Sequence, residues 1–301
     1  MSIQIGFDDG EANLDWIGLT EALRQGHTLP KAEIADTFLY RGKDTLLNRS
    51  AWIDGLGLAV KCATVFPGNP SAGVPMINGA VSLFDDAHGR LEAIIDFHLI
   101  TKWKTAGDSL LGALRLARPE SRKVLIIGSG TVARSLHDAY SAGFGDAEFT
   151  VWSRTRANAD AFAQDREATV ANDLEAAVRD ADIITSATMS TTPVLKGEWL
   201  QSGQHVDLIG AYRPDMREAD DVALQRARVF VDSFDTTIGH IGEVQIPLES
   251  GAIERSDLIA DYYSEDGFER HSNDEITLFK NGGGAHLDLM VSRYVLGRYT
   301  G

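Results

Sequence analysis

The part of the sequence that follows Lys123 alternates short apolar runs with segments of helical character. The runs "KVLIIG", "EFTVWS", "ADIITSAT", "HVDLIG" and "RVFVDS" have the length and composition of buried strands. Between the first of them, "TVARSLHDAYSAG", "RANADAFAQD" and "LEAAVRD" have helical spacing. Strands and helices that alternate at these lengths favour a parallel sheet with helical crossovers. We therefore predict an α/β fold with a doubly wound parallel sheet in this part of the chain.

A glycine-rich turn joins the first of these strands to the first helix. In "IIGSGTVA", Gly128, Gly130 and Ala133 have the spacing G-x-G-x-x-A. The glycines permit a tight turn and a close approach of the backbone to a pyrophosphate, which meets amide groups at the helix N-terminus. With a strand before it and a helix and second strand after it, the turn predicts a dinucleotide site on a Rossmann-type sheet. The alternative is an ordinary strand-to-helix turn.

The end of the second strand bears on which nicotinamide cofactor is bound. An acidic side chain there would accept hydrogen bonds from the ribose hydroxyls of NAD, but this sequence has Ser153, Arg154, Thr155 and Arg156. A charge-assisted hydrogen bond contributes about 1.5–3 kcal/mol, so an arginine on a 2′-phosphate would favour NADP. We expect NADP(H), and NAD(H) remains possible if both arginines are merely solvated.

The first part of the chain has a different pattern, of short strands separated by turns. "LAVKCATVF" and "GAVSLFDDAHGRLEAIID" are typical of strands, with "DAHGR" as a hairpin connection. A helix is expected from about Thr105, in "TAGDSLLGALRLA", and another in the last segment, "GAHLDLMVSRYVLGRY". In a chain of 301 residues this change of pattern favours two domains.

The charge and composition argue against several classes of partner. A formal net charge of -16 repels nucleic acid and anionic membranes, and no apolar stretch approaches the length needed to span a bilayer. The start of the sequence lacks the basic and apolar regions of a signal peptide, and the single cysteine, Cys62, fits a reducing compartment. We expect a cytoplasmic protein, and no metal because no residues cluster at metal-ligand spacing.

Five stretches stand in a recognisable order along the chain: "LAVKCATVFPGN", "ITKWKTA", "LIIGSGTVA", "DLIGAYRPDMRE" and "DEITLFKNGGGAHLDL". This set resembles the ornithine cyclodeaminase and mu-crystallin family, from about residue 50 to the end. The resemblance implies that residues 1–115 and 285–301 form an α+β substrate-binding and dimerisation domain, into which an NAD(P)-binding Rossmann domain of residues 116–284 is inserted. It also implies a homodimer and a substrate that is a small α-imino or α-amino carboxylate.

Two lysines fall on positions at which the family binds its substrate. Lys61 matches the family lysine that faces the substrate, and Lys104 falls on the family arginine that clamps the substrate carboxylate; the alternative for Lys104 is a surface lysine. A lysine supplies the charge without the two-pronged fork of arginine. Arg49 is therefore a candidate for a further carboxylate contact, or else it forms a salt bridge at a strand edge. Lys102 is expected to be solvated or close to phosphate.

The resemblance also points to other site residues. Tyr212 takes the place of the aspartate thought to assist ring closure in cyclodeaminases. A phenol, with an unperturbed pKa of about 10, is a poor base at neutral pH. Tyr212 is expected either to take part in catalysis or to pack on the nicotinamide. His286 is either a proton donor to the substrate or a helix-face histidine. The expected cofactor contacts are Thr105, Gly128, Ser129, Gly130, Thr131, Val132, Ser153, Arg154, Thr155, Ala187, Thr188, Gly210 and Asn281.

These features predict an NAD(P)H-dependent reductase of a small, cyclic α-imino acid such as Δ1-pyrroline-2-carboxylate or Δ1-piperideine-2-carboxylate. Lys61, Lys104 and Tyr212 are the expected catalytic residues, and Arg49 and His286 are expected to help bind the substrate. One alternative within the same fold is an ornithine cyclodeaminase or an alanine-dehydrogenase-like enzyme, and Tyr212 disfavours the first of these. Another is a non-catalytic NADPH-binding protein of the crystallin type.

Overall fold

A computed structural model describes residues 2–264 and 266–301, and the chain divides into two compact units. The flanking unit consists of the residues up to Lys104 together with Gly284–Gly301, and the inserted unit is Thr105–Gly283. The first boundary lies inside helix α3 (Phe97–Leu116), whereas we expected it at residue 115. The reason is that the second half of α3 packs on the inserted sheet: a Cβ on Gly112 would lie 2.6 Å from the ring of Phe279.

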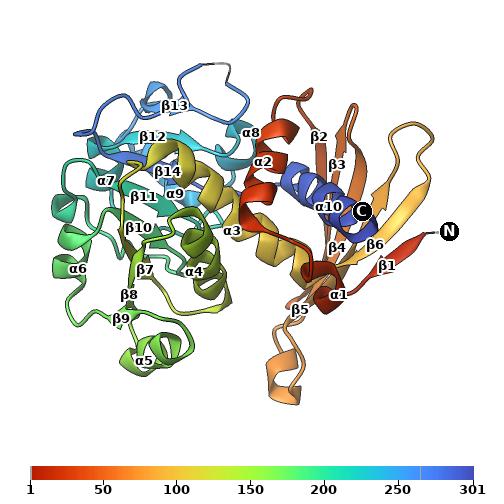
Figure 1. Cartoon of the computed structure of the whole chain (residues 1–301), viewed down its shortest axis with the longest axis horizontal. Helices are drawn as coiled ribbons and strands as arrows, with labels where there is room; N and C mark the ends of the chain where they lie inside the picture. Colours follow the sequence, from red (N-terminus) through yellow and green to blue (C-terminus); the bar gives the residue numbers. More distant parts are fainter. Residues whose placement is uncertain (1, 265) are drawn as a thin grey trace. The chain divides into compact units, whose positions relative to one another are not determined.

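The inserted unit is built on an eight-stranded sheet in the order β13-β12-β14-β11-β10-β7-β8-β9, and the paired strands are all parallel. Its strands are β7 (Lys123–Ile127), β8 (Glu148–Trp152), β9 (Thr169–Val170), β10 (Ile183–Ser186), β11 (His205–Leu208), β12 (Arg228–Val231), β13 (Leu258–Ala260) and β14 (Thr277–Lys280). Figure 1 shows the strand-helix alternation around this sheet. The expected parallel α/β sheet is confirmed.

Helices cover both faces of the inserted sheet. Alternate strand residues point to opposite sides, so both faces carry side chains that are buried by packing against helices. The helices and short 3-10 turns of this unit are α4 (Thr131–Gly143), α5 (Arg156–Asp165), α6 (Leu174–Asp180), η2 (Gly197–Trp199), α7 (Asp221–Arg226), α8 (Phe234–Thr237), α9 (Gly242–Ser250) and η3 (Arg255–Asp257). On one face, Leu125 and Leu208 lie in a buried apolar cluster with residues of α6, α7 and α9. On the other face, Tyr140 of α4 reaches Asp207 of β11. The sheet is therefore doubly wound.

The flanking unit is built on a six-stranded sheet in the order β1-β6-β5-β4-β3-β2. Its strands are β1 (Ile3–Ile5), β2 (Glu33–Arg41), β3 (Asp44–Ile53), β4 (Gly57–Val65), β5 (Ile77–Phe84) and β6 (Leu91–Asp96), and η1 (Asn69–Ala72) lies between β4 and β5. Only β1 and β6 pair in parallel. The expected β5-β6 hairpin, joined through residues 86–90, is confirmed.

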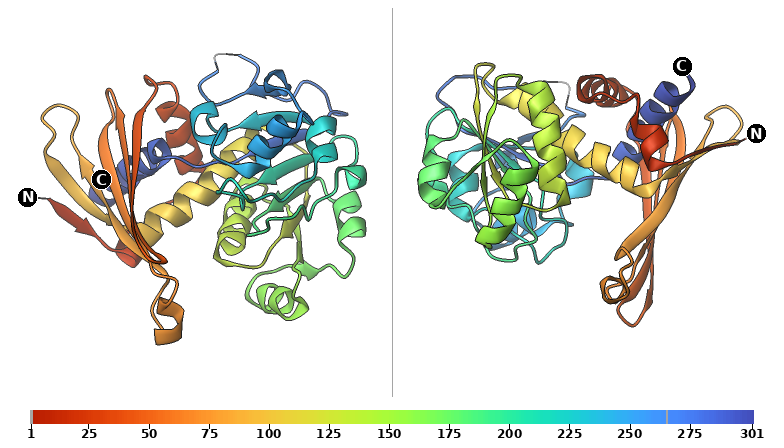
Figure 2. Two further views of the ribbon diagram at one scale, coloured as in Figure 1. Left: turned by 180° about the vertical axis from the view of Figure 1, so that it is seen from behind. Right: turned by 60° about the horizontal axis from the view of Figure 1, so that its bottom comes forward.

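Helices of the flanking unit lie against one face of its sheet. Helix α10 (Ala285–Thr300) lies against β3, β4 and β5, with α1 (Phe7–Glu11) and α2 (Trp16–Gly26) beside it (Figures 1 and 2). The covered face is almost fully buried at Ala59, Val81, Leu83 and Ile95. The outer face carries the alternate residues, including Trp52 and Ile94, which are exposed.

Helix α3 begins earlier than we expected from the sequence. The apolar run "AIIDF" supplies the end of β6, and the helix then starts at Phe97, because Asp96 accepts a hydrogen bond from the amide of Leu99 at 2.9 Å. Such a side chain satisfies one of the free amides of a first helical turn. The expected start near Thr105 is therefore wrong, and Lys102 and Lys104 lie within the helix.

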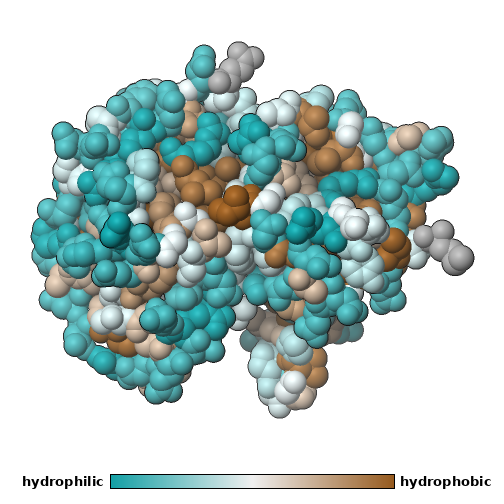
Figure 3. Space-filling view, viewed as in Figure 1, coloured by the Kyte–Doolittle hydropathy of each residue, from teal (hydrophilic) through white to brown (hydrophobic). Residues whose placement is uncertain are grey.

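The surface of the molecule is polar over most of the face shown in Figure 3, which fits a chain with 24% charged residues. Apolar patches interrupt it in several places. None of the helices in residues 2–264 and 266–301 combines the length and the apolar character that are needed to cross a membrane.

Candidate active site

The glycine-rich turn of the inserted unit has the conformation that a dinucleotide requires. Gly128 follows β7 with a φ of 117°, and a Cβ there would come within 2.7 Å of the carbonyl oxygen of Ala187. Gly130 is the N-cap of α4, and no atom lies within 4 Å of the place where its Cβ would stand. Ala133 is fully buried. The three small residues thus permit the turn, leave room for a ligand and allow close helix packing.

The amide groups of the first turn of α4 are available to an anion. No side chain caps this 13-residue helix at Gly130, so the amides of Thr131 and Val132 and the helix dipole favour a phosphate at this end. Arg134 donates to the carbonyl oxygens of Ser129 (2.6 Å) and Gly130 (3.4 Å) and so helps to fix the turn. These residues fit the pyrophosphate of a dinucleotide.

The residues after β8 include one arginine without a partner. Ser153 accepts a hydrogen bond from Ser129 at 3.1 Å, which ties the end of β8 to the glycine turn. Arg156 pairs with Asp160 at 2.7 Å and also donates to Asn172. The guanidinium of Arg154 is exposed and forms no ion pair or hydrogen bond with any residue in 2–264 or 266–301. Of the two arginines at this tip, Arg154 is thus the one left for a ligand, and Thr155 beside it is also exposed.

The loops after β10 and β11 are joined by a carboxylate that the sequence analysis missed. Glu218 is fully buried and accepts hydrogen bonds from five donors of these loops. They are the Ser186 hydroxyl (2.7 Å), the Thr188 amide (2.7 Å) and hydroxyl (2.8 Å), the Gly210 amide (2.5 Å) and the Ala211 amide (3.3 Å). Glu218 therefore fixes the backbone at Ala187, Thr188 and Gly210, three of the expected cofactor contacts, relative to one another.

A second carboxylate and a lysine accompany Glu218 in the interior of the inserted unit. Glu243 accepts from the amides of Glu218 (2.7 Å) and Ala219 (3.0 Å). Burial and the charge of Glu218 raise the pKa of Glu243 to about 7, and burial also raises the pKa of Glu218, while the nearby Lys280 lowers both. The Lys280 ammonium donates to two carbonyl oxygens, those of Leu208 and Asn281. One cation thus partly balances two buried acids.

The side chain of Asn281 is held in one orientation. Its Nδ2 donates to the carbonyl oxygen of Thr105 and to the hydroxyl of Ser109, both at 3.0 Å. Ser109 in turn donates to Asp207 at 3.1 Å, and burial raises the pKa of Asp207 to about 6. Both amide hydrogens of Asn281 are therefore engaged, which leaves its amide oxygen for a ligand.

The flanking unit contains a compact group of charges around Asp288. The Lys61 ammonium, on β4, lies 3.0 Å from Oδ1 of Asp288, and the Lys104 ammonium, on α3, lies 3.2 Å from the same oxygen. Lys61 also donates to the hydroxyl of Thr101 at 2.9 Å and stands 4.5 Å from the centre of the Phe97 ring. Lys61 and Lys104 are 6% and 7% exposed, so neither is a surface lysine.

The buried position of this group changes its protonation. Burial lowers the pKa of Lys61 to about 8, opposed by the charge of Asp288 and assisted by that of Lys104. Although burial raises it, the ammonium groups of Lys104 and Lys61 bring the pKa of Asp288 down to about 2. Asp288 is thus a carboxylate at neutral pH, and Lys61 is a weak acid close to its own pKa. Such a lysine is suited to giving up a proton.

Arg49 forms the strand-edge salt bridge that was one of its two expected roles, and it also lies near the buried lysines. It lies on β3 opposite Lys61 in the strand pairing, and its charge contributes to lowering the pKa values of Lys61 and Asp288. Its guanidinium nevertheless forms an ion pair with Asp36 of the edge strand β2 at 2.9 Å. A contact with a substrate would therefore compete with Asp36.

Two other expectations for this unit need correction or refinement. Lys102 pairs with Glu11 of α1 at 2.8 Å, so its ammonium is engaged within the flanking unit and is not simply solvated. His286, in the first turn of α10, is fully buried and lies edge-on to His27, with ring centroids 5.6 Å apart. Burial and the charge of His27 hold the pKa of His286 well below its usual range. A neutral, buried imidazole is a poor proton donor, so the structure favours the alternative of a helix-face histidine.

Tyr212 lies in the loop after β11 and is 57% exposed. The guanidinium of Arg213 stands 5.6 Å from the centre of its ring. The next acid along this loop, Asp215, is paired with Arg213 at 2.9 Å. It is therefore not free to act in place of the aspartate that Tyr212 replaces.

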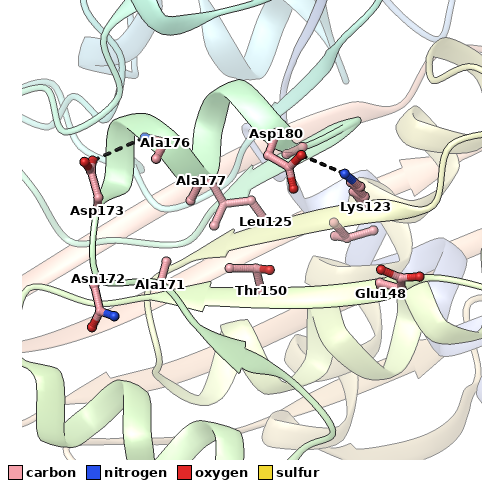
Figure 4. A pocket seen from close by; sticks show the side chains of 12 residues that line it. Lys123, Leu125, Glu148, Thr150, Ala171, Asn172, Asp173, Ala176, Ala177 and Asp180 are labelled. Atoms are coloured by element: carbon pink, nitrogen blue, oxygen red, sulfur yellow. Dashed lines mark hydrogen bonds and ion pairs between the residues drawn. The ribbon is translucent and has the colours of Figure 1, made fainter.

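A cavity of about 300 Å³ in the inserted unit lies away from these residues (Figure 4). It opens between α6 and the strands β7 and β8, and Lys123 and Glu148, at its rim, are the first residues of those strands. Cofactors bind outside the carboxyl ends of parallel strands, so this cavity at their amino ends is not the cofactor site. Within the described part of the chain, no three His, Cys, Asp or Glu side chains are grouped so as to hold a metal.

The sequence carries a signal for Asp288. Asp288 is the only acidic residue of α10 and follows the glycine run closely. Asp288 stands next to the apolar residues Leu287, Leu289 and Met290. A carboxylate buried among such residues needs a cation, and Lys61 and Lys104 were already candidates for burial. Glu218 gave a weaker signal, because only the fold brings its donors, at the ends of β10 and β11, to its carboxylate.

This chain is similar to several known enzymes over most of its length. The Delta(1)-pyrroline-2-carboxylate reductase of Paracoccus denitrificans (strain Pd 1222) is 49% identical over 300 residues, covering 97% of this chain and 95% of that protein. The ketimine reductase mu-crystallin of Mus musculus is 34% identical over 240 residues, covering 79% and 75%. An archaeal alanine dehydrogenase dimer with bound NAD matches with a TM-score of 0.88 and 26% identity, covering 99% and 95%.

A family model confirms the family resemblance seen in the motifs, and a further solved structure shows the same fold. A Thermococcus litoralis Delta(1)-pyrroline-2-carboxylate reductase, in complex with NADH and L-proline, has the same fold, with a TM-score of 0.88 at 24% identity over 98% of this chain and 97% of that chain. The model of the ornithine cyclodeaminase/mu-crystallin family matches residues 52–301. This chain therefore belongs to the ornithine cyclodeaminase/mu-crystallin family.

Proposed function

We propose that this protein is an NAD(P)H-dependent reductase of a small cyclic α-imino acid, with Δ1-pyrroline-2-carboxylate and Δ1-piperideine-2-carboxylate as the best candidates. The products would be L-proline and L-pipecolate. The observation that carries the proposal is the 49% identity, over 97% of the chain, to a Delta(1)-pyrroline-2-carboxylate reductase. The buried lysines of the flanking unit and the dinucleotide turn of the inserted unit supply the two parts that such a reaction needs.

The chain's own residues bind the substrate and handle its proton. The Lys104 ammonium attracts the substrate carboxylate, with Arg49 as a second cation if it leaves Asp36. The Lys61 ammonium donates a proton toward the imine nitrogen, because a protonated imine is the better hydride acceptor. When bound, a reduced nicotinamide would supply the hydride for the imine carbon, and the C=N electron pair would remain on the nitrogen that Lys61 protonates. Asn281 and the loops held by Glu218 would orient the nicotinamide ring, and Tyr212 would close the site beside it.

The cofactor is a nicotinamide dinucleotide, and we propose NADP(H) as the preferred form. The support is Arg154, whose exposed guanidinium has no partner in residues 2–264 and 266–301, next to a strand end without a carboxylate. Two of the related structures carry NADH and NAD in their complexes, so NAD(H) is the competing cofactor. A single well-placed charge-assisted hydrogen bond would favour NADP by about ten- to a hundredfold.

We also propose that the enzyme is a cytoplasmic homodimer that takes a small molecule and neither nucleic acid nor membrane as its partner. The related alanine dehydrogenase is a dimer. The outer face of the flanking sheet supports the same assembly, since Leu39, Trp52 and Ile94 expose apolar surface there. A net charge of -16 disfavours anionic partners.

The proposed reaction is tested by following NADPH and NADH absorbance with a panel of cyclic imines and of 2-oxo acids mixed with ammonia or methylamine. We expect turnover with one of the two cyclic imines, and a preference for NADPH that is lost in Arg154→Ala. Consumption only with pyruvate and ammonia would indicate an alanine-dehydrogenase-like enzyme. Cofactor binding without oxidation by any compound would instead support the non-catalytic alternative and overturn the proposal.

A further inference from the structure

Asp288 stands where two buried ammonium groups meet. Both Lys61 and Lys104 approach its Oδ1, at 3.0 and 3.2 Å, and Asp288 itself is 1% exposed. Its position in the first turn of α10 suits a carboxylate, because the helix dipole stabilises negative charge at that end. The other oxygen, Oδ2, is buried without a hydrogen-bond partner among the described residues. The carboxylate therefore faces the lysines with one oxygen and leaves the other uncommitted.

Two ammonium groups in such a place need a carboxylate to remain charged. Burial disfavours the charged form of Lys61, and the charge of Lys104 disfavours it further. The charged groups that act on Lys61 come from three elements: Asp288 on α10, Lys104 on α3 and Arg49 on β3. Arg49 is already paired with Asp36, and His286 on α10 is held neutral. Among the residues described, Asp288 is thus the only acid that ion-pairs with Lys61.

We propose that Asp288 is a positioning residue of the reaction: it gathers the ammonium groups of Lys61 and Lys104 at one oxygen and keeps both charged until a substrate anion arrives. This rests on the proposed function, because it assigns Lys61 and Lys104 to the proton and the carboxylate of an imino acid. The three side chains carry a net charge of +1, from two ammonium groups and one carboxylate. A substrate with one carboxylate neutralises the group, whereas a neutral imine would leave one buried cation uncompensated.

The proposal predicts a specific change in how Lys61 titrates. Asp288 raises the pKa of Lys61, so removing its charge in Asp288→Asn should move that titration to lower pH by about one to three pH units. Since the protonated lysine is the active form, the fall of kcat/KM on the alkaline side should move to lower pH by the same amount. In the wild type we expect that fall near pH 8, where Lys61 loses its proton.

Three variants separate this role from a structural one. Asp288→Glu keeps the charge and should leave the alkaline fall close to that of the wild type. Asp288→Asn should shift it. The double variant Asp288→Asn/Lys104→Met removes one charge of each sign. The pH at which its kcat/KM falls should therefore lie closer to that of the wild type than in the single variant, although we expect its KM to be higher. The double variant also removes the uncompensated cation, so it remains testable if Asp288→Asn fails to fold.

A second measurement does not depend on turnover. Lysines labelled with 13C at Cε report their own titration by NMR, and Lys61→Arg identifies the signal of Lys61. A shift of this titration in Asp288→Asn together with a shift of kcat/KM supports the proposal. An unchanged titration of Lys61, or a titration that shifts while the kinetic profile does not, overturns it. If the wild type turned over none of the imines, the proposed function would be contradicted. The NMR titration would still decide whether Asp288 holds Lys61 charged.

Discussion

Lys102 and Lys104 stand two positions apart on α3, yet their surroundings give them different chemistry. Lys102 is about a quarter exposed at its side chain and pairs with Glu11, whereas Lys104 is buried and shares Asp288 with Lys61. A change of two residues on a helix rotates a side chain by roughly 200°, so the two ammonium groups point in different directions. Lys102 therefore links α3 to α1 within the flanking unit, whereas Lys104 is part of the charged group around Asp288.

This difference gives a matched pair of variants on one helix. Lys104→Met should raise the KM for the imino acid by about ten- to a hundredfold, because it removes a charge-assisted contact of about 1.5–3 kcal/mol with the substrate carboxylate. Lys102→Met removes an equal charge nearby and should change KM only slightly. Initial rates against substrate concentration, at saturating cofactor, measure both. Similar increases in the two variants would show that general electrostatic attraction, and not a contact at Lys104, binds the carboxylate.

At the scale of secondary structure, the loops after β10 and β11 act together because both are bonded to Glu218. Neither loop is regular, and each carries residues expected to contact the cofactor, Thr188 and Gly210. A Cβ on Gly210 would lie 2.0 Å from the carbonyl oxygen of Thr188, so the two loops are also in direct contact. The donors of both loops converge on a carboxylate that has no hydrogen of its own to offer. An amide in its place would turn one acceptor into a donor and leave some of these buried groups unpaired.

We therefore expect Glu218→Gln to weaken the binding of NADPH and NADH by about tenfold or more, since an unpaired buried polar group costs about 1–3 kcal/mol. Asp220→Asn is the matched control. Asp220 ends the same loop, where its side chain accepts from the amides of Gly197 (2.8 Å) and Ala223 (3.0 Å) as the N-cap of α7, but it binds none of the donors that Glu218 holds. Its loss should lower the melting temperature without changing the Kd, which cofactor fluorescence measures. Equal changes of Kd in both variants would contradict a specific role of Glu218.

At the scale of the whole molecule, the outer face of the flanking sheet exposes several large apolar side chains. Strands β2 to β6 place Leu39, Trp52, Leu58, Val60 and Ile94 on the side opposite α10. Trp52 and Leu39 are 49% and 65% exposed. Large apolar side chains exposed on one face of a sheet are typical of an interaction site. A second copy of the chain is the partner that we propose.

The homodimer is tested by Val60→Glu, which puts a charge in the middle of this face. We expect the wild type to have the mass of a dimer by light scattering, and Val60→Glu to have that of a monomer, because a buried unpaired charge destabilises an interface. Val222→Glu, at an exposed apolar position on α7 in the inserted unit, provides the control and should remain a dimer. A monomeric wild type, or a variant that stays dimeric, would contradict this assembly.

The sequence by itself determined the local elements of this protein. Helices α5 and α6 begin and end at the residues that their patterns indicated, 156–165 and 174–180, and the glycine turn at Gly128 and Gly130 has the expected conformation. These features depend on periodicity, caps and the backbone freedom of glycine, which are all readable over a few residues. The start of α3 was missed because Asp96, its cap, stands inside an apolar run that also ends a strand.

Only the tertiary structure decided which charges meet. Lys61 and Asp288 are 227 positions apart in the chain, and their contact exists because α10 packs on β4. Likewise, Glu218 binds donors from two strands' ends because those strands are neighbours in the sheet. The identity of a buried acid's partner depends on how distant elements pack, and no local pattern records that. The lysines and the lone acid of α10 were visible in the sequence, but only the fold showed that these charges meet at one oxygen.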